Sequence, residues 1–108
     1  MNELPDEEDC RKAPEFPGCA VRDMLIVNKK GLHARATAKF VQCVERFGGA
    51  EVFVHRCGET VGGTSIMGIL TLGAGIGSTI QVAAKGEEAE AALDAIGALV
   101  ASRFGEDE

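Results

Sequence analysis

Aromatic residues of the kind that stack on nucleic-acid bases are scarce in this chain. Its 108 residues include no Trp, no Tyr and only five Phe. Proteins that read RNA or single strands usually stack bases on several such side chains. The net charge of −6 is also of the wrong sign for a phosphate backbone. Both observations argue against nucleic acid as a partner.

Long apolar runs are missing as well. No stretch is long enough to cross a bilayer as a helix. The first nine residues include five acids, whereas a secretory signal is basic and then apolar. The sequence therefore predicts a cytoplasmic protein without membrane insertion, and its length suits one small folded domain.

Closely spaced cysteines are also absent. The four cysteines stand at Cys10, Cys19, Cys43 and Cys57, with no C-x-x-C pair among them. Structural zinc sites are built from close ligand pairs, so we expect no metal. In a reducing cytoplasm all four cysteines are expected to be free thiols.

Charge is distributed unevenly along the chain. Residues 1–20 contain six acids, two bases and three prolines, and we expect them to form a flexible acidic N-terminal extension. Residues 106–108 are all acidic and are expected to form a C-terminal tail. Residues 21–105 carry eight acids and nine bases and are expected to fold as the single domain.

The hydrophobic pattern of that domain predicts four strands and three helices. Apolar and β-branched runs bounded by turn residues predict strands at 21–27, 50–55, 60–62 and 78–84. Apolar positions at helical spacing, and Ser65 as a helix N-cap, predict helices at 34–47, 66–72 and 87–103.

The order β-α-β-β-α-β-α predicts an α+β fold. Three helices are expected to cover one face of a four-stranded antiparallel sheet. The other sheet face is expected to be exposed to solvent, with His55 on it as an ordinary surface residue.

His33 stands where a turn is expected to become a helix. A helix start gathers unpaired N–H groups and partial positive charge, which favour an anion such as phosphate. The same charge discourages protonation of the imidazole and leaves a lone pair for attack. Arg35 offers a planar fork suited to phosphoryl oxygens, and Lys29, Lys30 and Lys39 add positive potential. We hypothesise that His33 accepts a phosphoryl group; the alternative is an exposed histidine that only caps the helix.

Other catalytic arrangements find less support in the sequence. No paired carboxylates lie inside an apolar stretch for acid–base work. The glycines at 73–77 lack the GxGxxG spacing of a dinucleotide-binding loop, and no Lys-Ser or Lys-Thr pair follows them as in a P-loop.

The segment Gly31-Leu32-His33-Ala34-Arg35 resembles the active-site segment of the HPr family, the phosphocarriers of the bacterial phosphoenolpyruvate-dependent phosphotransferase system (PTS). Residues 63–70 resemble the regulatory-serine segment of that family, and residues 85–88 resemble the opening of its last helix. With the order of elements, the resemblance covers about residues 21–104. It implies the family's open-faced β-sandwich of four antiparallel strands and three helices.

For function, the resemblance implies a phosphoryl relay rather than a self-contained enzyme. Phosphorylated enzyme I would transfer a phosphoryl group to Nδ1 of His33, forming a phosphohistidine. The group would then pass to an enzyme IIA-type domain, in sugar transport or its regulation. Arg35 would balance the phosphoryl charge. The resemblance implies no cofactor, and we expect a monomer.

The resemblance also implies regulation at Ser65, which matches the serine modified by an HPr kinase/phosphorylase in part of the family. The alternative is an unmodified helix cap. Ile66, Met67 and Leu70 are expected to be partly exposed anchors for partner proteins, with Lys39 contributing to the same interactions. Simple core packing is the competing interpretation for the apolar residues.

One residue departs from the family pattern. The family usually has proline directly after the arginine, where this chain has Ala36. Proline favours the first helical turn by fixing φ, so the helix start is expected to be less rigid here. Two other functions remain open: a nitrogen-related PTS regulatory carrier and, with less support, a phosphorylation-independent interaction module.

Overall fold

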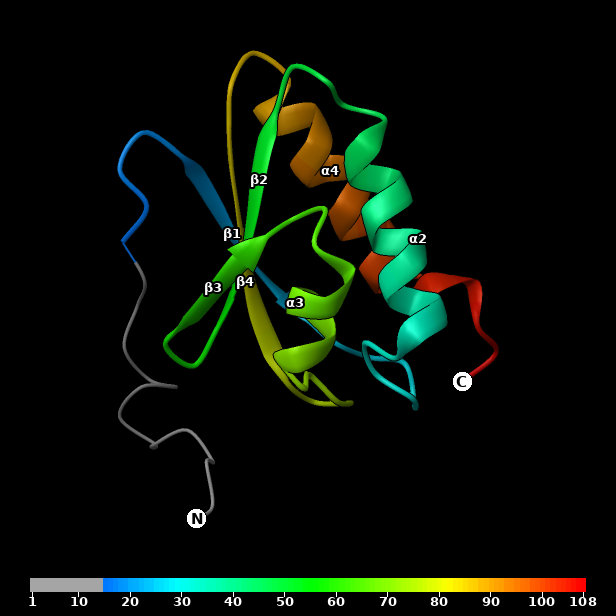
Figure 1. Cartoon of the computed structure of the whole chain (residues 1–108). Helices are drawn as coiled ribbons and strands as arrows, with labels where there is room; N and C mark the ends of the chain where they lie inside the picture. The colour runs from blue at the N-terminus through cyan, green and yellow to red at the C-terminus, as the bar shows by residue number, and fades with distance from the viewer. Residues whose placement is uncertain (1–14) are drawn as a thin grey trace.

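The computed structural model describes residues 15–108 (Figure 1). Its strands are β1 (Ala20–Leu25), β2 (Glu51–Arg56), β3 (Glu59–Gly62) and β4 (Thr79–Lys85). Its helices are α2 (Ala34–Glu45), α3 (Ile66–Thr71), α4 (Ala89–Ala101) and the 3-10 turn η1 (Arg103–Gly105). The predicted order and the α+β class are confirmed.

The four strands form one antiparallel sheet in the order β1-β4-β2-β3. Met24 of β1 pairs with Ile80 of β4, and Val54 of β2 lies between Val82 of β4 and Val61 of β3. Alternate residues of each strand point to the same face, so these apolar pairs build one inner face. Figure 1 shows α2, α3 and α4 together on that side of the sheet.

The core lies between this inner face and the helices. Helices α2 and α4 contribute apolar residues at three- and four-residue spacing, which places them on one side of each helix. The fully buried large side chains include Phe40, Ile26, Ile69, Ile80, Leu93, Ile96 and Phe104. The helical stripes expected from the sequence are therefore the ones that the fold buries.

Helix α4 begins two residues later than the sequence pattern predicts. The Glu88 side chain turns toward the loop after α2, and its Oε1 accepts a hydrogen bond from the Gly49 N–H at 2.7 Å. Glu88 is thus the N-cap residue of α4, and Glu90 alone lies in its first turn. A tertiary hydrogen bond, which local pattern cannot show, moves this boundary.

The expectation that His55 is an exposed residue is wrong. Its exposed fraction is 6%, and its Nδ1 lies 2.9 Å from Oε1 of Gln81 on the neighbouring strand. The Phe16 ring meets the imidazole edge-on, with 6.1 Å between the ring centroids. His55 does lie on the outer sheet face, but a residue of the predicted extension covers it.

The expectation of four free thiols is also wrong. Cys57, in the turn between β2 and β3, is disulfide-bonded. Cys19 and Cys43 are free, and burial raises the pKa of the Cys43 thiol. The prediction for Cys10, like most of the predicted extension, falls on residues 1–14, outside the described part of the chain.

Candidate active site

A tight turn before α2 places His33. Gly31 has φ +66° and donates its N–H to the Asn28 carbonyl at 3.1 Å. A Cβ at Gly31 would lie 2.5 Å from the Ala74 carbonyl oxygen, so only glycine fits there. The next residue, Leu32, donates its N–H to that same oxygen at 2.9 Å and is buried. This loop-to-loop contact fixes where the chain enters α2.

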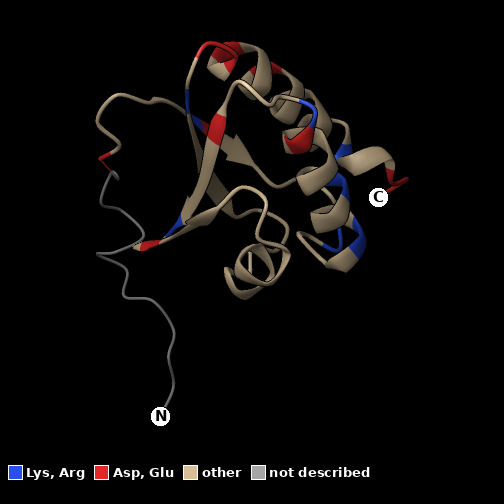
Figure 2. Cartoon of the chain, turned by 45° about the horizontal axis from the view of Figure 1, so that its top comes forward, with Lys and Arg blue, Asp and Glu red and all other residues tan. Residues whose placement is uncertain are grey.

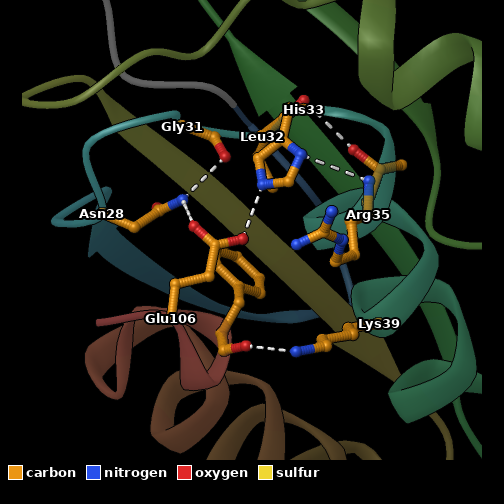
Figure 3. Close-up of polar contacts among 9 residues, drawn as sticks. Asn28, Gly31, Leu32, His33, Arg35, Lys39 and Glu106 are labelled. Carbon is orange, nitrogen blue, oxygen red and sulfur yellow. Dashed lines mark hydrogen bonds and ion pairs between the residues drawn. The ribbon is translucent and has the colours of Figure 1, made fainter. Parts of the chain in front are cut away.

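His33 is itself the N-cap residue of α2. Its backbone is extended, with φ −76° and ψ 179°, while its carbonyl accepts the first helical hydrogen bond from Thr37 N–H at 2.8 Å. Its side-chain Nδ1 accepts a hydrogen bond from the Arg35 N–H at 3.3 Å (Figure 3). The lone pair of Nδ1 therefore points at the positive end of the helix.

The other ring nitrogen of His33 faces a carboxylate. Nε2 lies 2.5 Å from Oε2 of Glu106, and Oε1 of Glu106 accepts a hydrogen bond from Asn28 Nδ2 at 3.0 Å. A carboxylate can only accept, so Nε2 carries the proton, and Nδ1 is the unprotonated nitrogen. Both hydrogen bonds of the ring thus require the same tautomer.

Asn28 connects this pair to the turn. It is fully buried, and its Nδ2 also donates to the Gly31 carbonyl at 2.9 Å. One amide group therefore bridges the turn that carries His33 and the carboxylate that holds its ring, as Figure 3 shows.

A left-handed turn brings Glu106 to the site from 73 residues away. Arg103, Phe104 and Gly105 all have positive φ, which reverses the chain after α4. Phe104 is fully buried and anchors this turn. Its carbonyl accepts a hydrogen bond from the Lys39 ammonium of α2 at 2.6 Å. Lys39 thereby ties the tail to the helix that His33 caps.

The pKa of the Glu106 carboxyl lies below its ordinary value. The hydrogen bond from His33 is the largest cause, and the one from Asn28 acts in the same direction. Burial opposes them, because the side chain is only 14% exposed. Glu106 is therefore ionised at neutral pH and gives the protonated Nε2 a permanent acceptor.

Four basic and three acidic side chains line the cavity next to His33. An open cavity of about 700 Å³ is lined by Lys29, Lys30, Arg35, Lys39 and residues 105–108. Figure 2 shows basic residues gathered around the start of α2, near the C-terminus. Among residues 15–108 the Arg35 guanidinium has no hydrogen-bond or ion-pair partner, whereas Lys29 pairs with Glu108 at 3.3 Å. The full charge of Arg35 is thus available to an anion beside the imidazole.

Helix α3 carries the second group of predicted site residues. Ser65 is its N-cap, as predicted, and Oγ accepts a hydrogen bond from Gly68 N–H at 3.1 Å. Met67 is 71% exposed and Ile66 43% exposed, whereas Leu70 is half-buried. Ile69, which the sequence did not single out, fills the core. The α3 surface is therefore an apolar patch with an exposed serine hydroxyl at its edge.

The structure brings His33, Arg35 and Lys39 together, as the sequence predicts, and adds Glu106 and Asn28. No local signal marks Glu106, because it stood in an acidic tail that composition assigns to solvent. Asn28 stood in turn material and gave no sign of burial.

Residues 15–108 contain no cluster of three or more His, Cys, Asp or Glu side chains that could hold a metal ion. No helix in this part of the chain is long and apolar enough to cross a membrane.

A histidine whose free nitrogen lies at a helix start among cations, on an open-faced α+β sandwich, is the arrangement of a histidine phosphocarrier. The family model described as "PTS HPr component phosphorylation site" matches residues 20–102. The chain therefore belongs to the HPr family of PTS phosphocarriers.

Relatives and solved structures agree with this assignment. The chain is 48% identical to "Phosphocarrier protein HPr" of Cupriavidus necator over 87 residues, which cover 81% of this chain and 97% of that protein. It is 42% identical to "Phosphocarrier protein NPr" of Shewanella violacea, over 79% of this chain and 92% of that one. The crystal structure of HPr-C-His from Thermoanaerobacter tengcongensis superposes with a TM-score of 0.78 at 37% identity, covering 82% and 99% of the two chains. The chain is thus a phosphocarrier that works with other PTS proteins.

Proposed function

We propose that Nδ1 of His33 is the atom that carries the phosphoryl group. The observation that supports this most is that the two ring nitrogens have different hydrogen-bond partners. Nε2 is held by Glu106, while Nδ1 has only the long hydrogen bond from the Arg35 N–H. The nitrogen with the available lone pair is also the one at the helix start, where an added phosphate is stabilised.

In the proposed step, the Nδ1 lone pair attacks the phosphorus of a phosphorylated donor. The new N–P bond forms as the bond from phosphorus to the donor breaks, and the donor keeps that electron pair. Nε2 keeps its proton and its hydrogen bond to Glu106 throughout, so the carrier neither gains nor loses a proton. Phosphoryl transfer needs mainly alignment and positive charge, which Arg35 and the helix N-terminus supply. Reversal of the step delivers the group to the acceptor, so the chain is a carrier and not an enzyme in its own right.

For the relay partners, we infer that phosphorylated enzyme I is the donor and an enzyme IIA-type domain the acceptor. The family membership supports this assignment. The alternative of a nitrogen-related carrier is supported by the similarity to the NPr protein of Shewanella violacea. Purified enzyme I and IIA domains of the sugar and nitrogen branches, compared at equal concentration, would separate the two by their rates of transfer.

The test of His33 is incubation with enzyme I and labelled phosphoenolpyruvate. We expect one label per chain, labile in acid and stable in base as for a phosphohistidine, and its loss in His33→Ala. His55→Ala is the matched control and keeps the label, since His55 lies on the outer face of the sheet. Label retained by His33→Ala would overturn the assignment.

We also propose that Ser65 is a regulatory phosphorylation site, modified by an ATP-dependent HPr kinase/phosphorylase. Its exposed hydroxyl stands beside the apolar surface of Ile66 and Met67. A phosphate would add nearly two negative charges there and repel an acidic partner. Incubation with ATP and the kinase should give an acid-stable phosphate that is absent in Ser65→Ala; a stable phosphate on the Ala variant would contradict the site.

Partner docking is proposed to use Ile66, Met67 and Leu70 of α3, and Lys39 of α2, whose ammonium lies on the η1 side of that helix. Exposed apolar side chains at this density support a contact surface. Met67→Lys should raise the KM for the carrier in transfer from enzyme I, with little change in thermal stability. Ile76→Lys, at an equally exposed loop residue, is the control. Equal KM values for both variants would remove α3 from the interface.

A further inference from the structure

Part of the outer sheet face is covered by residues that lie outside the family match. The family match begins at residue 20, where β1 also begins. The described chain begins five residues earlier, at Glu15. Figure 1 shows these residues on the side of the sheet away from the helices.

Phe16 is the contact residue of this segment. Its ring stacks on Phe53 of β2, with 6.3 Å between centroids and 18° between planes, and meets His55 edge-on. Phe53 pairs with Ala83 of β4, which is fully buried although it lies on the outer face. Lys85 Nζ lies 6.0 Å from the centroid of Phe53. Phe16 therefore completes a small second cluster on the face opposite to the core.

A turn links this cluster to the edge of the sheet. Cys19 donates its N–H to the Phe16 carbonyl at 3.0 Å, and Gly18 has φ +78°. The chain then enters β1, the edge strand, while Phe16 lies over β2, two strands away. Residues 15–19 thus cross the sheet and connect its edge to its middle.

We propose that residues 15–19 are a strap, outside the part of the chain that matches the family, that covers the middle of the outer sheet face by docking Phe16 on Phe53 and His55. The strap is a local structural device: it stabilises the sheet and buries His55, and it lies on the opposite side from His33. It is therefore distinct from the proposed relay, and its opening leaves phosphoryl acceptance unchanged.

The first test is a double-mutant cycle on Phe16 and Phe53 in the full chain, read by urea unfolding. Aromatic pairs contribute beyond their burial, so the two side chains should be coupled by about a two- to tenfold change in the unfolding equilibrium constant. Phe16→Leu keeps apolar volume and should lose less than Phe16→Ala. Ile76→Ala, which truncates an exposed apolar side chain, is the control and should leave the unfolding equilibrium constant nearly unchanged. If the changes in the free energy of unfolding caused by Phe16→Ala and Phe53→Ala were strictly additive, the docking would be overturned.

The second test measures the exposure of His55 directly. The chain has two histidines, so in a His33→Ala background the N-carbethoxylation of imidazole by diethyl pyrocarbonate, followed by its ultraviolet absorbance, reports on His55 alone. Adding Phe16→Ala should speed that reaction about tenfold, the upper end of the pair's coupling. An unchanged rate would show that Phe16 does not cover His55. In chains with His33 intact, Phe16→Ala should accept label from enzyme I at the original rate; a large loss would overturn the separation of the strap from the site.

Discussion

At the scale of single residues, the Glu106 carboxylate determines which nitrogen of the His33 imidazole is protonated, although the two residues lie 73 positions apart in the sequence. Glu106 fixes the proton of His33 on Nε2, and a neutral imidazole with a protonated Nε2 is nucleophilic only at Nδ1. Glu106 is therefore a positioning residue. It leaves Nδ1 as the ring nitrogen with a lone pair, and it keeps the ring oriented toward α2.

Glu106→Gln should flatten the dependence of stability on acid pH. A carboxyl with a lowered pKa stabilises the fold fully above its ordinary value of 4.5, and that contribution is lost as pH falls through the folded pKa. We expect the original chain to lose this contribution as pH falls below that ordinary value, and the variant to lose less stability over the same range. Urea unfolding across this range is the measurement. Glu45→Gln, an exposed acid of α2, should behave like the original chain; parallel curves for all three proteins would contradict the role of Glu106.

Residue-level prediction from sequence agrees with the structure on placement where the signal is local. The sequence places His33 and Arg35 at the start of a helix, and the structure does the same; their chemical roles remain proposals. The sequence did not place Glu106 at the site, because its approach depends on three successive left-handed residues and on the burial of Phe104. His55 was misjudged because Phe16, which covers it, stood in a segment whose composition indicates an extension.

At the scale of elements, the start of α2 carries the departure from the family pattern. Ala36 is buried and lies before the first helical N–H donor, which is Thr37. A proline at position 36 would therefore remove no helical hydrogen bond, and it would restrict the unfolded chain.

Ala36→Pro should stabilise the protein by about 0.4–1 kcal/mol, measured by urea unfolding. Ala38→Pro is the matched control, two residues further into the helix, and should cost about 3 kcal/mol or more. A loss of stability in Ala36→Pro would mean that the buried site has no room for the ring.

Helix α3 depends on its cap, because it has only six residues. Ser65→Ala removes the acceptor of Gly68 N–H and should cost the helix about 1 kcal/mol. Hydrogen exchange at the amide of Gly68 should then speed up about fivefold or more. Thr64→Ala, one residue earlier, is the control and should leave that amide unchanged.

The boundaries of the elements show the same division between local and distant causes. The sequence located α3 correctly, since its Ser cap and apolar run are adjacent. It placed the start of α4 too early, because the Glu88 carboxylate is engaged by Gly49 from the far end of α2. The order of the four strands and three α-helices, which depends only on the succession of patterns, was predicted correctly, whereas the 3-10 turn η1 was not predicted.

At the scale of the whole molecule, basic residues gather at one place although the net charge is negative. Figure 2 shows the bases around the start of α2, and the acidic residues 106–108 line the same cavity. The four bases of this cavity exceed its three acids by one charge, so the site can still attract a phosphorylated donor, because salt screens the more distant charges.

Phosphoryl acceptance should therefore slow as salt rises, by about tenfold from low ionic strength to about 0.5 M. Stopped-flow transfer from phosphorylated enzyme I is the measurement. Lys30→Gln, in the cavity beside His33, should slow the reaction and weaken its salt dependence. Lys85→Gln, which neutralises a base on the outer face, is the control. The same salt slope in all three proteins would exclude steering by this cluster.

The hydrogen bond that caps α2 affects both the stability of the helix start and the availability of Nδ1 for phosphoryl transfer. In the proposed relay, the Nδ1 lone pair that caps α2 in the empty carrier is the same lone pair that bonds to phosphorus when the carrier is loaded. A short, strong hydrogen bond to Nδ1 would make its lone pair less nucleophilic. Without the hydrogen bond, the first turn of α2 would fray and Arg35 would lose its position beside the imidazole. The 3.3 Å contact from Arg35 N–H to Nδ1 lies between these extremes. The hydrogen bond at the start of α2 is thus strong enough to cap the helix and weak enough to leave Nδ1 available for transfer.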